Sequence, residues 1–109
     1  MTDREYLELA AKAAGIYVVA PDEYEISAGG KGGLLVSGYG ACDHWNPLTD
    51  DGDAFRLAVK CGLVVDCSRP SAGEPYKQHA VWLDETMSNN ELTRRAIVRA
   101  AAEIGRSKA

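Results

Sequence analysis

The sequence has only three cysteines, Cys42, Cys61 and Cys67, and their spacing is irregular. An odd number of irregularly spaced cysteines argues against a disulfide framework, so we expect reduced thiols in a reducing compartment. Together with His44 and His79 the cysteines could supply soft metal ligands, but structural zinc sites usually show paired close spacings, and here one residue separates Cys42 from His44 and five separate Cys61 from Cys67. We therefore expect no metal and no cofactor.

Long apolar runs and an excess of positive charge are absent as well. The longest apolar runs, such as residues 16–20 and 63–65, are too short to cross a bilayer. The first five residues lack the basic and apolar regions of a secretory signal, so we expect a cytoplasmic protein without membrane association. The formal net charge of −4 argues against direct nucleic-acid binding and is compatible with a protein partner that carries a basic surface.

The composition is otherwise that of an ordinary globular chain. Hydrophobic residues make up 46% and charged residues 26% of the 109 positions, which is enough to form a core without crosslinks. There is no repeat, linker or low-complexity segment. We expect one domain over residues 1–109, with a frayed tail from about residue 106.

Two of the three predicted helices begin with a capping box. Thr2 with Glu5 and Ser88 with Glu91 have the spacing in which side chain and backbone cap each other. The first helix is expected to stop at Gly15. The last is expected over about residues 89–104, with Gly105 as its stop and an apolar stripe of Leu92, Ala96, Ile97, Ala100, Ala101 and Ile104.

The middle helix follows an acidic segment. Thr49, Asp50 or Asp51 can cap its positive N-terminal end, and Gly62 is expected to end it. From the periodicity we predict that its buried face consists of Ala54, Phe55, Ala58 and Val59. Capping accounts for Asp50, Asp51 and Asp53 better than a cation site does, because their spacing differs from that of a calcium-binding loop.

The strands are expected in two groups between these helices. The predicted strands are residues 16–20, 24–27, 34–37, 63–67 and 76–83, whereas residues 38–45 and 68–75 are predicted to be loops. The resulting order, α-β-β-α-β-β-α, predicts an α+β fold: a small layered sandwich with a largely antiparallel sheet.

Several segments offer possible chemistry without a complete motif. Residues 29–33, with Lys31 among four glycines, lack the gap and the hydroxyl residue of a phosphate loop, so we interpret them as a hairpin tip that can contact a partner. No pairing of a cysteine or serine with a histidine is evident, so we expect no enzyme, although a minor activity stays open. Four further sets of residues are candidates for a role. The candidates for a weakly anion-binding face are Arg94, Arg95, Arg99 and Arg106, and those for the core are Trp45 and Trp82. The candidates for an aromatic contact surface are Tyr17, Tyr24 and Tyr39, and those for self-association are Ala96, Ala100, Ala101 and Ala102.

Three segments together resemble a known family. Residues 7–15, the Trp-Asn-Pro-Leu-Thr-Asp-Asp motif that opens residues 45–54, and residues 93–105 resemble small phage and prophage proteins with a phage α/β/α (ABA) sandwich domain. The resemblance implies a phage origin, a sandwich fold and a location in the cytoplasm of an infected or lysogenic bacterium. It implies no catalytic residues.

We therefore expect a small accessory protein that acts by binding. The leading hypothesis is an inhibitor of a host protein, such as a bacterial defence complex of the CRISPR type, whose basic nucleic-acid channel would receive acidic side chains. The alternatives are a binder that sequesters a nucleotide signal, using residues 29–33 and an arginine of the last helix, and a minor enzyme. The candidate partner-binding residues are Asp22, Glu23, Tyr24, Glu25, Lys31, Asp50, Asp51 and Asp53; a homo-oligomer is a further expectation.

Overall fold

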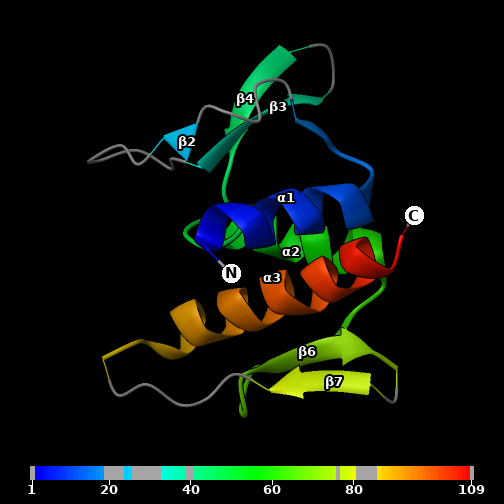
Figure 1. Ribbon diagram of the computed structural model, residues 1–109. Helices are drawn as coiled ribbons and strands as arrows, with labels where there is room; N and C mark the ends of the chain where they lie inside the picture. Colours follow the sequence, from blue (N-terminus) through cyan, green and yellow to red (C-terminus); the bar gives the residue numbers. More distant parts are fainter. Residues whose placement is uncertain are drawn as a thin grey trace.

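The computed structural model describes residues 2–18, 24–25, 33–38, 41–75, 77–80 and 86–108. In this part of the chain the α+β class is confirmed, with helices that alternate with groups of antiparallel strands in the predicted order. Figure 1 shows the helices in the middle of the molecule, one sheet above them and the other below. The elements are α1 (Asp3–Ala14), β1 (Tyr17–Val18), β2 (Tyr24–Glu25), β3 (Gly33–Gly38), β4 (Ala41–Trp45), α2 (Asp51–Cys61), β5 (Val64–Asp66), β6 (Ser71–Glu74), β7 (Lys77–Ala80) and α3 (Asn89–Ser107).

All three predicted helix starts are confirmed. The side chains of Thr2, Asp50 and Ser88 each accept a hydrogen bond from the backbone N–H three residues later, which satisfies a donor that the helix leaves unpaired. Gly15 and Gly62 end α1 and α2 in the left-handed conformation, with φ of 70° and 64°. These ends depend only on neighbouring residues.

The first sheet is built around β3. Strand β4 pairs antiparallel along one edge of β3, from Leu34 opposite Trp45 to Gly38 opposite Ala41, so the prediction of an irregular loop over residues 38–45 is wrong. Strands β1 and β2 pair antiparallel with β3 as well, β1 at its C-terminal half and β2 at its N-terminal half. The predicted antiparallel pairing of residues 24–27 with 34–37 is confirmed for the described residues.

The second sheet has the order β5-β6-β7, and all its pairs are antiparallel. Its central strand, β6, lies inside the segment that we predicted as a loop, so that prediction is also corrected. Ser71, Ala72 and Gly73 are buried where β6 packs against α3. Because these side chains are so small, the backbone of the strand can approach the helix closely, and tertiary packing outweighs their low strand propensity.

The core is rich in alanine and centres on α3, which packs mainly against α1. Gly105 does not end α3; it is buried within the helix, which continues to Ser107. A β-carbon at Gly105 would lie 2.0 Å from the carbonyl oxygen of Leu9, so only glycine fits this approach of α3 to α1. The alanines that we proposed for self-association face this core and have no surface to offer a second copy; they are Ala96, Ala100, Ala101 and Ala102.

Candidate binding groove

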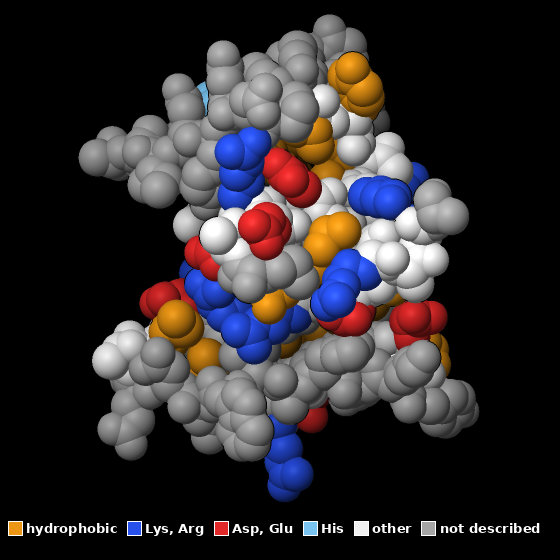
Figure 2. Space-filling model, in the orientation of Figure 1, with side chains coloured by type: hydrophobic (Ala, Val, Ile, Leu, Met, Phe, Trp, Pro, Cys, Tyr) orange, Lys and Arg blue, Asp and Glu red, His pale blue; other side chains and the backbone are white. Residues whose placement is uncertain are grey.

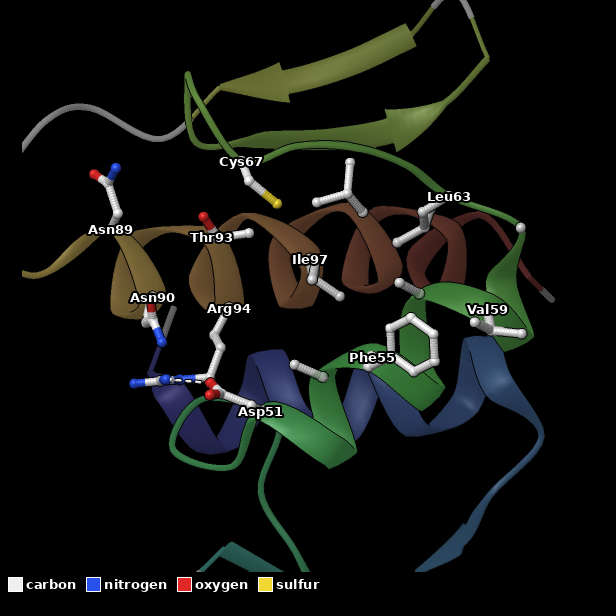
Figure 3. Close-up of a pocket in the computed structure, with 14 residues that line it drawn as sticks. Asp51, Phe55, Val59, Leu63, Cys67, Asn89, Asn90, Thr93, Arg94 and Ile97 are labelled. Carbon is white, nitrogen blue, oxygen red and sulfur yellow. Dashed lines mark hydrogen bonds and ion pairs between the residues drawn. The ribbon is translucent and has the colours of Figure 1, made fainter.

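An open groove of about 680 Å³ lies between α2 and the first half of α3, beside β5 (Figure 3). Small and aliphatic side chains from both helices and from β5 line most of its length; among them are Ala54, Ala58, Leu63, Val65 and Ile97. Asn89, Asn90, Thr93 and Arg94 form a polar end at the start of α3. The groove can therefore take an apolar group and offers hydrogen bonds at one end.

Phe55 and Val59 stand at the edge of this groove on α2. Their exposed fractions are 69% and 65%, so the prediction that they lie on the buried face is wrong. Leu57, at 1% exposed, packs into the core between Ala54 and Ala58, which are buried as predicted. Phe55 is the single phenylalanine of the chain. An exposed pair of large apolar side chains beside an apolar hollow is typical of a contact surface.

The polar end of the groove is held by Arg94. Its Nε donates to the carbonyl oxygen of Leu48 at 2.8 Å, and its Nη1 donates to the carboxylate of Asp51. The side chain of Arg94 is 15% exposed, whereas that of Asp51 is 68% exposed. Arg94 thus ties α3 to the segment that enters α2, and Asp51 stays accessible at the rim.

A buried corner fixes where α2 begins. Trp45 is 7% exposed, which confirms its predicted place in the core, and Asn46 and Pro47 after it are also buried. The backbone N–H of Asn46 donates to Oδ2 of Asp53 at 3.0 Å. Arg56 donates to the other oxygen, Oδ1, at 2.8 Å. Asp53 is therefore a structural anchor, because both oxygens of its carboxylate are engaged and the residue is 4% exposed.

Two free thiols lie on α2 and just after β5. Cys67 is exposed, lines the groove and turns its sulfur toward it in Figure 3. Cys61 is half-buried, and burial raises the pKa of its thiol although Lys108 and Lys60 act in the opposite direction. Neither is bonded to another cysteine, and the described residues contain no group of three side chains placed to hold a metal ion.

The predicted arginine face is divided among several contacts. Arg94 faces the groove, Arg95 pairs with Asp3 at 3.1 Å, and Arg106 pairs with Glu103 at 3.1 Å. The guanidinium carbon of Arg99 lies 5.7 Å from the ring centroid of Tyr6 on α1. In Figure 2 charges of both signs lie beside one another among the coloured side chains of the visible face. Arg95 and Arg99 therefore contact α1 and Arg94 contacts the segment before α2, whereas the contact of Arg106 stays within α3.

The predicted partner-binding residues fall into two groups. Asp22, Glu23 and Lys31 lie outside the described residues, as does most of the glycine-rich tip, whereas Tyr24 and Glu25 are described as the backbone of β2. Asp50, Asp51 and Asp53 gather at the start of α2, where Asp50 is the helix cap. Phe55 and Val59 were missed as surface residues, although their i,i+4 spacing beside Ala54 and Ala58 shows that α2 has two apolar faces.

The described part of the chain contains no helix long and apolar enough to span a membrane. Its groove offers apolar contact and a few hydrogen bonds, which suits binding. Comparison of the chain with families of proteins, with curated proteins and with solved structures finds no match.

Proposed function

We propose that this protein acts by binding another protein through the groove between α2 and α3. The observation that supports the proposal is the exposure of the only phenylalanine, at 69%, beside an apolar groove of about 680 Å³. Aromatic side chains at the centre of an interface bury a large apolar area at low cost in conformational entropy. A partner that offers an apolar helix or loop would cover Phe55 and Val59 together.

The partner that we propose is a protein of a bacterial host. The resemblance to small phage proteins and the net charge of −4 support this choice, because an acidic protein is attracted to the basic surfaces of nucleic-acid-handling defence complexes. The protein would then act by occupying its target in the bacterial cytoplasm. Asp51, 68% exposed at the rim of the groove, is the described acidic residue best placed to contact such a target.

Two matched substitutions test this proposal. Phe55→Ser removes the exposed ring at the groove, and Tyr17→Ser removes a ring that is 70% exposed on β1. Immobilised wild type and Tyr17→Ser are expected to retain the same discrete protein from a bacterial host lysate, and Phe55→Ser is expected to lose it. If Phe55→Ser retains that protein as well as wild type does, the groove is not the binding surface.

A small ligand is the second candidate, because the groove has the size of many ligand sites. A nucleotide is poorly matched to it, since Arg94 already donates to Leu48 and Asp51 and the remaining lining is mostly apolar. Mass spectrometry of the extract from purified, denatured protein distinguishes the two candidates. A stoichiometric small molecule whose loss accompanies Phe55→Ser would favour the ligand over the protein partner.

A further inference from the structure

The outward face of α2 has an ordered arrangement of charge and apolar surface. Asp51, Phe55 and Val59 follow one another at intervals of four residues, so they form one stripe along the helix. Lys60 is exposed beside the C-terminal end of this stripe. The stripe is thus acidic where α2 begins, apolar in its middle and basic where α2 ends.

We propose that this stripe pairs two copies of the chain, with their α2 helices antiparallel about a two-fold axis. A two-fold interface uses the same surface on both copies, so that surface must be complementary to itself. The groove satisfies this condition, because a projecting ring, Phe55, stands beside an apolar hollow on one face of the molecule. Phe55 of each copy enters the groove of the other and covers Val59.

The charges favour the antiparallel arrangement. It brings Asp51 of one copy toward Lys60 of the other at both ends of the contact, and it sets the two helix dipoles in opposition. A parallel pair would instead place Asp51 beside Asp51 and Lys60 beside Lys60. Asp51 already binds Arg94 of its own chain but keeps 68% of its side chain exposed, so Lys60 of the other copy adds a second contact to the same carboxylate.

The exposed area indicates a weak dimer. A phenylalanine buries roughly 150–250 Å² when fully covered, and Phe55 has 69% of its surface exposed. Together with Val59 and the groove walls, the contact falls at or below the lower end of stable interfaces, which bury about 1,200–2,000 Å² in total. A reversible equilibrium between monomer and dimer is the expected behaviour.

Pairing also affects the binding of a host protein, and only this part of the inference rests on the proposed function. A dimer that covers Phe55 in each copy closes the groove to any other protein. A host protein would then compete with the second copy, and binding would convert the dimer into a one-to-one complex of chain and target.

Sedimentation velocity of the reduced, purified chain over about 5–500 μM tests the proposal. Wild type and Tyr17→Ser are expected to move from 11.7 kDa toward twice that mass, whereas Phe55→Ser stays monomeric. If circular dichroism shows that Phe55→Ser is unfolded, Val59→Ser replaces it. A wild type that stays monomeric, that forms larger assemblies, or that dimerises equally well without the ring overturns the proposal.

A charge swap tests the antiparallel register. Lys60→Glu is expected to weaken the dimer about tenfold. Asp51→Lys also breaks the contact of Asp51 with Arg94, so it is measured alone and together with Lys60→Glu, and the two changes together are expected to weaken the dimer less than the sum of the single changes. Additive effects of the two changes refute this register. A wild type that captures a host protein through Phe55 but does not dimerise overturns only the self-pairing, and a wild type that dimerises through Phe55 but captures no host protein overturns only the proposed function.

Discussion

Gly105 offers a direct test of how α3 packs against α1, because two physical effects of Gly105→Ala have opposite signs. Alanine is favoured over glycine inside a helix by about 1 kcal/mol, so helix propensity alone predicts a more stable protein. The packing predicts the reverse. The new β-carbon would lie 2.0 Å from the carbonyl oxygen and 2.8 Å from the carbonyl carbon of Leu9.

The size of the effect follows from the identity of these atoms. Both belong to the backbone of α1, so no side chain can rotate away, and the two helices must separate by at least about 1 Å. That movement loosens contacts between small buried side chains, among them Ala10 and Ala101, which have no length with which to fill the gap. We expect a net loss of about 2–4 kcal/mol in the free energy of unfolding after the gain in propensity is subtracted.

Urea denaturation followed by circular dichroism measures this loss, and thermal melts should show a decrease in Tm of about 10–20 °C. Ser107→Ala is the control, because Ser107 is exposed in the last turn of the same helix; its effect should stay within about 0.5 kcal/mol. An unchanged or increased stability of Gly105→Ala would show that α3 and α1 do not approach each other as described.

Three further variants test the core, the assignment of faces and one hydrogen-bonded turn. Trp45→Ala should lower the free energy of unfolding by about 3–5 kcal/mol, measured in urea, because the ring is 7% exposed. Leu57→Ala should lower the free energy of unfolding by about 2–5 kcal/mol, whereas Phe55→Ala should change it by no more than about 0.5 kcal/mol in the monomer at low concentration. The reverse ranking would show that Phe55 lies on the buried face of α2, as predicted from the sequence. Ser68→Ala should raise the pKa of Asp66 in an NMR titration, because hydrogen bonds from the side chain of Ser68 and from the backbone N–H groups of Arg69 and Ser68 lower it. Because these hydrogen bonds lower the pKa of Asp66 in the folded state, they stabilise the fold above about pH 4, and this stabilisation is lost as the pH falls through the lowered pKa. The free energies of unfolding of wild type and Ser68→Ala, plotted against pH, should therefore converge in acid.

The helix starts were predictable because their determinants are local. Thr2, Asp50 and Ser88 cap the backbone three residues away, and each such contact can be recognised within a few positions of sequence. Gly105 shows the limit of that reasoning. Glycine after an apolar stripe signals a helix end as readily as a close approach between helices, and the choice depends on Leu9, which lies 96 positions away in the chain.

The two missed strands have a related cause. Strand β6 consists of Ser71, Ala72, Gly73 and Glu74, a composition with little strand propensity, and it is stabilised by pairing with β5 and β7 and by contact with α3. Strand β4 follows glycines and lacks a clear alternation, yet it pairs with β3 over five residues. In both, the decisive interactions are distant in sequence or depend on a neighbouring strand.

The face of α2 that meets the core is decided by the space available there. Its periodicity offers two apolar faces, one with Leu57 between two alanines and one with Phe55 and Val59. The helices that α2 packs against present mostly alanine, so the backbones lie close together and the core admits Leu57 beside Ala54 and Ala58. Burying Leu57 in place of Phe55 and Val59 forgoes the transfer free energy of about one large side chain, roughly 1.5–3 kcal/mol. The fold therefore leaves Phe55 and Val59 accessible to the proposed contact at the groove.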